Sequence, residues 1–259
     1  MSLGPPMQID KPKLILSIRL YKQLDIPPDI EPVALNFMHA TNWCHLFAFK
    51  LRELKLMLPG FDHLYIYTTP LLPHLELRLR QIGGGVASID CGIDRSRLAS
   101  TREGNENLLV DVISDSFRIL PAMDAHELNK VDLVRERILA SRLALEVQAG
   151  YAVNREFEVK VLFTAGSAPK LTLNLTEAET GLTRCLEVVA LKDPEDAFWL
   201  TSKVQIKRGC IEIVPRMSHR SQLQFRNLYV LDLDAKGLLS ADSKSIEVPL
   251  QMILNGSSN

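Results

Sequence analysis

Apolar and polar residues alternate over residues 13–22, KLILSIRLYK, near the beginning of the chain. The apolar positions of one parity are Leu14, Leu16, Ile18 and Leu20. This period of two predicts a strand with one buried face. The β-branched and aromatic run HLYIYTT, residues 63–69, predicts a second strand, and VASIDCGI, residues 86–93, predicts a third.

A helical spacing of apolar residues begins at Asn42 and continues to Leu58. Pro59 and Gly60 follow it, and these residue types commonly stand just beyond the end of a helix, so we expect the helix to end there. The segment LELRLRQI, residues 75–82, fits a strand by alternation and a short helix by propensity, and both alternatives stay open.

Two further helices are predicted before the middle of the chain. The first covers residues 106–120, ENLLVDVISDSFRIL. The second begins at Asp124, where Glu127 three residues later imitates a capping box, and Gly150 is expected to end it. Its apolar positions are Leu128, Val131, Val134, Ile138 and Leu145.

Beyond Gly150 the chain consists of short extended runs separated by turn clusters, a rhythm that predicts an antiparallel meander. The runs are REFEVKVLF, KLTLNLTE, LTRCLEVVAL, FWLTSKVQI, CIEIVP, QLQFRNLYVLDLD and SIEVPLQMIL. The predicted fold class is therefore α+β, a mixed helix and strand half followed by the meander. We expect a single domain over residues 14–254, with a subdivision near Gly150 as the alternative, a flexible leader over 1–13 and a flexible tail over 255–259.

Composition and charge narrow the function classes without choosing one. Apolar residues make up 46% of the 259 residues and charged residues 24%, as in ordinary globular proteins. Lys and Arg number 30 against 31 Asp and Glu, and by halves the counts are 17 against 18 up to Gly150 and 13 against 13 beyond it. No basic field for nucleic acid is visible, so we expect no nucleic-acid partner.

No apolar run approaches the ~20 residues that cross a bilayer, so no membrane partner is expected. The leader MSLGPPMQIDKPK lacks the apolar core of a secretory signal. The four cysteines, Cys44, Cys91, Cys185 and Cys210, lie far apart, so we expect reduced and mostly buried thiols in a cytoplasmic protein.

Four of the six histidines fall within 36 residues, which raises the question of a metal site. They are His39, His45, His63 and His74. Zinc ligands commonly include a pair at tight helical or turn spacing, and the spacings here are 6, 18 and 11 residues. We therefore expect ordinary histidines, with no metal and no other cofactor.

The adjacent Cys44 and His45 allow either a catalytic dyad or simple packing. On a helical wheel Cys44 falls on the apolar arc and His45 on the polar side near Arg52, so packing is favoured. Phe49 and Leu56 stand beside them in the polar face. Either a second layer of the protein covers this seam, or His45, Phe49, Arg52 and Leu56 contact another protein.

Other motifs fail on inspection. Asp232 and Asp234 follow an apolar run, but a dehalogenase-type phosphatase normally places its DxD near the N-terminus, and Ser243 stands where a calcium loop needs glutamate. The simplest interpretation of Asp232 and Asp234 is the end of a strand that leads into a turn. The glycines at 83–85 match neither a phosphate loop nor a dinucleotide fingerprint.

The segments LILSIRLYKQLDIPP and ALNFMHATNWCHLFAFKLRELKLMLPGFDHLYIYTTP together resemble the opening of a family of bacterial immunity proteins associated with polymorphic toxins. The resemblance covers about a quarter of the chain and carries no functional residue with it. It implies a small cytoplasmic protein that binds and neutralises a cognate toxin domain. Such proteins act through shape, charge and a few anchors.

Three functions follow from these observations as alternatives. The first is a non-catalytic binding protein that neutralises a bacterial toxin, with the seam of His45, Phe49, Arg52 and Leu56 as its contact. The second is an enzyme that uses the region of His39, His45, Asp62 and His63. The third is a scaffold subunit of a bacterial assembly, which would expose a large apolar surface.

Overall fold

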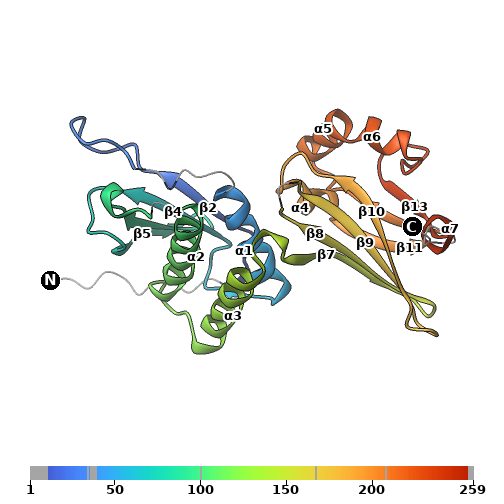
Figure 1. The fold of residues 1–259 in the computed structure, drawn as a ribbon, viewed down its shortest axis with the longest axis horizontal. Coiled ribbons are helices and arrows are strands. Elements are labelled where there is room, and N and C mark those ends of the chain that lie inside the picture. Colours follow the sequence, from blue (N-terminus) through green and yellow to red (C-terminus); the bar gives the residue numbers. More distant parts are fainter. Residues whose placement is uncertain are drawn as a thin grey trace. The chain divides into compact units, whose positions relative to one another are not determined.

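The computed structural model describes residues 11–33, 35, 40–99, 101–166, 168–207 and 209–255. The chain forms two compact units, Met1–Arg142 and Leu143–Asn259, shown in Figure 1. Helices are mixed with strands in the first unit, and antiparallel sheets fill most of the second. The α+β class and the antiparallel meander predicted from the sequence are therefore confirmed.

Over its described residues, the first unit holds three α-helices, two short 3-10 turns and six strands. The helices are α1 (Ala40–Glu53), α2 (Arg102–Arg118) and α3 (Ala125–Ser141), with the turns η1 (Arg95–Arg97) and η2 (Arg142–Ala144), of which η2 runs into the second unit. The strands are β1 (Lys13–Leu14), β2 (Ser17–Lys22), β3 (Met57–Leu58), β4 (His63–Thr69), β5 (Leu77–Gly83) and β6 (Val86–Gly92).

The main sheet of the first unit has the strand order β2-β4-β6-β5. The strands β2, β4 and β6 are parallel, and β5 runs antiparallel to β6, which decides the open choice for residues 75–82 in favour of a strand. Their register places Ser17 beside His63 and Tyr65 beside Ser88. A separate two-stranded sheet pairs β1 with β3.

Side chains alternate between the two faces of this sheet, as the period of a strand requires. The positions Ile18, Leu64 and Ile89 are fully buried on one face. Helix α1 packs on β2 and also contacts α2 and α3, so the three helices gather over this buried face (Figure 1). The other face carries half-buried polar and aromatic side chains from the same strands, among them Tyr65.

Helix α1 ends earlier than the sequence predicted, and the beginning of α3 matches the prediction only in part. Helix α1 ends at Glu53, before Pro59 and Gly60, because Lys55 turns the chain with a φ of 54° and residues 57–58 then pair as a strand. The N-cap of α3 is confirmed, since the Glu127 amide donates to the Asp124 carboxylate at 2.8 Å. The Glu127 side chain does not complete the capping box; its carboxylate accepts from the Met57 amide at 2.9 Å.

In the described part of the second unit, seven strands form two antiparallel sheets and are accompanied by four short helices. The meander has the order β10-β9-β8-β7, and the second sheet has the order β11-β12-β13. The strands are β7 (Glu146–Val153), β8 (Phe157–Thr164), β9 (Lys170–Glu177), β10 (Thr183–Ala190), β11 (Lys203–Lys207), β12 (Cys210–Val214) and β13 (Ile246–Pro249). The helices are α4 (Asp196–Leu200), α5 (His219–Leu228), α6 (Val230–Ala235) and α7 (Leu250–Asn255).

Three of the extended runs predicted beyond Gly150 contain helix. Residues 222–234, predicted as one strand, lie in α5 and α6, so Asp232 and Asp234 belong to a helix and not to a strand end. The runs at 198–206 and 245–254 are each part strand and part helix.

Gly150 lies inside β7 and does not end a helix, which is a second correction to the prediction for α3. The helix stops at Ser141, where Arg142 adopts a φ of 54°. A Cβ atom on Gly150 would stand 2.4 Å from Cγ2 of Val204 on β11. Glycine is needed at this position because the two strands approach each other too closely for a larger residue.

Candidate functional site

The predicted seam on α1 divides between the interior and the surface of the protein. His45 is 5% exposed and Leu56 is fully buried, whereas Phe49 and Arg52 are partly exposed. The wheel placed His45 on the polar side, but α1 is covered by the sheet and by α2 and α3, so that side is also buried. The His45 and Phe49 ring centroids lie 6.2 Å apart. A partner approaching this seam would reach Phe49 and Arg52 only.

Cys44 is a packing residue, as the wheel predicted. Its side chain is 1% exposed, and burial raises the pKa of the Cys44 thiol to about 12. Cys91 is equally buried, and burial raises its pKa to about 12 as well. A thiol with such a pKa carries almost no thiolate at neutral pH, so neither residue is a nucleophile.

The difference in exposure between the buried and the accessible cysteines gives a direct test of the packing. Cys185 is exposed and Cys210 is half-buried. We expect iodoacetamide to modify Cys185 first in the native protein and to leave Cys44 and Cys91 unmodified until the chain is unfolded, because access and thiolate content both limit the reaction. Peptide mass spectrometry over a time course measures this order. Equal rates at Cys44 and Cys185 in native protein would contradict the packing described here.

The histidine region named for the enzyme alternative is only partly brought together. His39 lies outside the described residues. His45 is buried in α1, while Asp62 and His63 are neighbours at the beginning of β4, with His63 Nε2 3.5 Å from Asp62 Oδ1. The structure adds Ser17, whose Oγ lies 2.6 Å from Nδ1 of His63. Sequence reasoning missed Ser17 because only the parallel register of β2 and β4 joins positions 46 residues apart.

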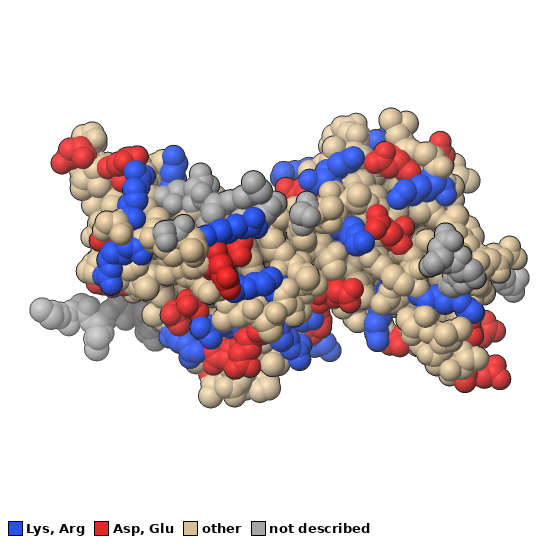
Figure 2. Space-filling view, in the orientation of Figure 1, with Lys and Arg blue, Asp and Glu red and all other residues tan. Residues whose placement is uncertain are grey.

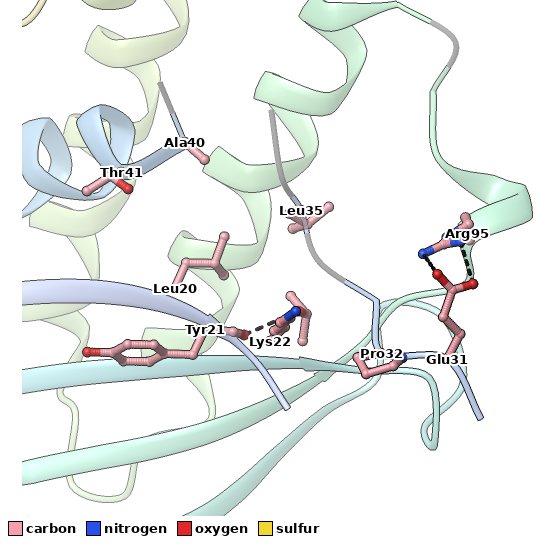
Figure 3. A pocket seen from close by; sticks show the side chains of 10 residues that line it. Leu20, Tyr21, Lys22, Glu31, Pro32, Leu35, Ala40, Thr41 and Arg95 are labelled. Carbon is pink, nitrogen blue, oxygen red and sulfur yellow. Dashed lines mark hydrogen bonds and ion pairs between the residues drawn. The ribbon is translucent and has the colours of Figure 1, made fainter. Parts of the chain in front are cut away.

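A polar crevice lies at the carboxyl ends of the parallel strands, the usual ligand position in open α/β sheets. Its volume is about 500 Å³, and Lys22, Thr41, Thr68 and Arg95 are among its lining residues (Figure 3). The Arg95 guanidinium faces the Glu31 carboxylate in two hydrogen bonds of 2.8 and 3.1 Å. Both partners are well exposed, and exposed pairs of this kind add only ~0–1 kcal/mol.

The two most exposed large apolar side chains described in the second unit, Leu231 and Met217, lie on α6 and just before α5, and Leu223 and Leu228 on α5 are exposed as well. Leu231 is 82% exposed, Met217 71% and Leu223 46%. The i to i−4 backbone hydrogen bonds continue from Tyr229 to Phe225 and from Leu233 to Tyr229, both at 3.0 Å, so the side chains keep helical spacing across the junction of α5 and α6.

That spacing sorts the side chains into two opposite stripes. The first stripe anchors the helices, since Phe225, Tyr229 and Leu233 recur every four residues and are fully buried. The second stripe, Leu223, Asn227 and Leu231, recurs at the same interval and is exposed. We call Met217, Leu223, Leu228 and Leu231 the α5–α6 patch.

The α5–α6 patch has basic neighbours before Leu231 and acidic ones after it, since Asp232 and Asp234 are exposed on α6. Between Arg216 and Leu231 the sequence contains Arg216, Arg220 and Arg226 and no aspartate or glutamate. Arg220 and Arg226 are exposed, and the Arg216 guanidinium lies 4.1 Å from the centroid of the Phe198 ring. On the face shown in Figure 2, acidic and basic residues are interspersed. The patch is therefore suited to an apolar partner surface with charges of both signs around it.

No protein-family model, curated protein sequence or solved structure matches this chain. Within the described residues, no helix is both long enough and apolar enough to span a bilayer. Over that same part of the chain, no group of three or more His, Cys, Asp or Glu side chains is arranged to hold a metal ion.

Proposed function

We propose that this protein is a binding protein that neutralises a bacterial toxin domain by covering part of its surface. The observation that carries the proposal is the α5–α6 patch. A leucine that is 82% exposed, beside further exposed apolar side chains on consecutive helices, is typical of a protein contact surface. The resemblance of residues 14–28 and 34–70 to immunity proteins supplies the kind of partner.

The chemistry of the patch describes the complementary surface on the toxin. Apolar side chains at the centre of an interface contribute most of the binding energy once they are desolvated. Arg220 and Arg226 flank them on α5, and Asp232 and Asp234 flank Leu231 on α6, so complementary charges on the partner would fix its orientation. A toxin surface with an apolar hollow for Leu231, and with carboxylates and basic groups placed to meet the arginines and the aspartates, fits both properties.

The test is a binding measurement against the products of the genes next to the one that encodes this chain. We expect one of them to form a stoichiometric complex, measured by titration calorimetry, and to lose its toxicity when the two proteins are coexpressed. Leu231→Asp should weaken that complex at least ~30-fold, the effect of losing a central anchor. The fold should be unaffected, because the side chain contributes little to the core.

Leu182 provides a matched control, since it is a leucine in the same unit with 50% exposure and lies outside the patch. Leu182→Asp should bind like the unchanged protein. Equal affinities for Leu231→Asp and Leu182→Asp would remove the α5–α6 patch from the proposal. If no neighbouring gene product binds this chain, or if the bound product stays toxic when the two proteins are coexpressed, the neutralising role itself is contradicted.

A further inference from the structure

Three polar side chains form a connected chain at the amino ends of β2 and β4. The parallel register sets Ser17 beside His63, and Ser17 Oγ lies 2.6 Å from His63 Nδ1. On the other side of the same ring, His63 Nε2 lies 3.5 Å from Asp62 Oδ1. A hydroxyl, an imidazole and a carboxylate thus follow one another in that order.

The order of the atoms fixes what each group can do. When Ser17 donates its hydroxyl proton to Nδ1, the neutral ring must carry its own proton on Nε2, which faces Asp62. A nucleophile hydrogen-bonded to a base, with the base oriented by a third group, is the arrangement of an activated serine. The His63 side chain is 33% exposed and that of Asp62 25%, so a substrate can reach them.

The backbone holds this chain of groups in place. The amides of Asp62 and His63 both donate to the Gly85 carbonyl, at 3.0 and 3.2 Å. Asp62 Oδ1 lies 3.3 Å from the point where a Gly85 Cβ would stand, and Lys13 Nζ lies 3.9 Å from that point. Lys13 Nζ and Asp62 Oδ1 therefore both border the glycine turn that joins β5 to β6.

Aromatic rings extend from His63 across the same face of the sheet. The Tyr65 centroid is 6.2 Å from the His63 ring, and Tyr21 lies 5.4 Å from Tyr65. Tyr67 is stacked 5.4 Å from Tyr21, and the Arg80 guanidinium lies 4.7 Å from the Tyr67 centroid. The three tyrosines are half-buried, so they offer ring surface to an apolar or aromatic group next to Ser17.

We propose that Ser17 is the nucleophile of an acyl-transfer site that accepts esters with an apolar or aromatic acyl group. Ser17 Oγ bonds to the ester carbonyl carbon while its proton passes to Nδ1 of His63. The carbon–oxygen bond to the alcohol then breaks, and the alcohol leaves with that proton. Water attacks the acylated serine, gives its proton to His63, and releases the acid as Ser17 recovers the proton. Asp62 is a positioning residue that holds the ring in the required tautomer.

The probe is a fluorophosphonate, which reacts with activated serines by forming an oxygen–phosphorus bond as fluoride leaves. We expect time-dependent labelling of the intact protein, with the adduct located on Ser17 by peptide mass spectrometry. Ser17→Ala should abolish this adduct. His63→Gln should slow it at least ~100-fold, because general-base catalysis contributes 10²–10⁴-fold. Turnover of p-nitrophenyl butyrate should fall in parallel.

Ser88 supplies the matched control, since it stands on the same face of the sheet opposite Tyr65 and is 5% exposed. Ser88→Ala should be labelled at the rate of the unchanged protein. Asp62→Asn should slow labelling and Asp62→Glu, which keeps the carboxylate, should restore most of the rate. This pair tests the site even where a His63 variant fails to fold, as judged by circular dichroism.

Absence of an adduct on Ser17, or unchanged labelling of folded His63→Gln or Asp62→Asn, would overturn the proposal and leave the three groups as a structural polar cluster. The α5–α6 patch plays no part in this reaction. Leu231→Asp should therefore be labelled normally, so the acyl-transfer site and the toxin-binding proposal stand or fail separately.

Discussion

Gly92→Ala is expected to unfold the first unit, or to lower its free energy of unfolding by at least ~3 kcal/mol. Gly92 is the last residue of β6, and a Cβ atom there would stand 1.9 Å from the Pro73 carbonyl oxygen and 2.8 Å from that of Leu72. Both are backbone atoms, which cannot rotate away as the end of a side chain can. The strand or the loop would have to move.

Movement at Gly92 would also break the hydrogen bonds that join the loop to β6. The Leu75 amide donates to the Gly92 carbonyl at 2.7 Å, and the Gly92 amide donates to the Glu76 carbonyl at 2.8 Å. Because these groups are paired across the end of the sheet, separating them adds to the steric cost. Urea unfolding followed by circular dichroism measures the loss.

Gly83 is the control for this substitution. It ends the neighbouring strand β5, and a Cβ atom there would meet nothing within 4 Å. Gly83→Ala should therefore change the unfolding free energy by less than ~0.5 kcal/mol, as surface substitutions usually do. An unfolding midpoint of Gly92→Ala equal to that of Gly83→Ala would contradict the close approach at β6.

The second large effect concerns a buried polar network in the second unit. The Tyr229 hydroxyl donates to the Asp196 carboxylate and accepts from the Lys192 amide at 2.7 Å. The Trp199 indole donates to the same carboxylate at 2.8 Å. Tyr229→Phe takes one hydrogen bond from the buried Asp196 carboxylate, which still accepts from Trp199 and from the Asp193 amide, and removes the hydroxyl that the Lys192 amide donates to. We therefore expect a loss of ~1–2 kcal/mol in urea unfolding.

The same network predicts how stability depends on pH. Burial raises the pKa of Asp196, even though the hydrogen bonds from Tyr229 and Trp199 act in the opposite direction. The folded protein therefore holds the Asp196 proton more tightly than the unfolded chain does. The stability contributed by this group is complete below the ordinary carboxyl pKa of ~3.9 and is lost as pH rises through the raised value.

Comparison with Asp196→Asn isolates this contribution, because asparagine does not titrate. The stability of the unchanged protein relative to Asp196→Asn should increase as pH falls from ~7 toward ~4. Asp242 is the control of opposite sign, since a hydrogen bond from Ser240 lowers the pKa of its carboxyl group. Relative to Asp242→Asn, the unchanged protein should keep its stability down to about pH 4 and lose it only below that value, as pH falls through the lowered pKa of Asp242. If stability relative to the asparagine variant changed with pH in the same direction for Asp196 and Asp242, the opposite pKa shifts given to these two groups would be wrong.

The sequence was a good guide where one face of a strand is buried and a poor one where a surface is apolar. The strand predicted at 63–69 is β4 residue for residue. Residues 222–234 resembled a strand because Leu223, Phe225, Tyr229, Leu231 and Leu233 all stand at odd positions. Phe225, Tyr229 and Leu233 belong to the core of a helix pair, whereas Leu223 and Leu231 are exposed. The two exposed leucines produced the false period of two.

The candidate sites were less accessible to sequence reasoning than the fold. The helical wheel placed His45 on the solvent side of α1, because nothing in the local sequence pattern shows that α2 and α3 also pack against this helix. Ser17 and His63 meet only through strand register, which local spacing does not contain. Gly150 looked like a helix end, and its actual requirement is the close approach of Val204 from β11.

The way in which the sheets are paired also has a consequence for the order in which the two units fold. The strands of the β7–β10 meander each pair with their neighbour in the chain, so those contacts close short loops. The β2–β4 pairing must instead join residues 46 positions apart, from Ser17 to His63, before α1 can be enclosed. Contacts between distant residues slow folding because loop closure must precede any gain in packing. The main sheet of the first unit is thus expected to assemble more slowly than the β7–β10 meander, although its strands leave the ribosome first.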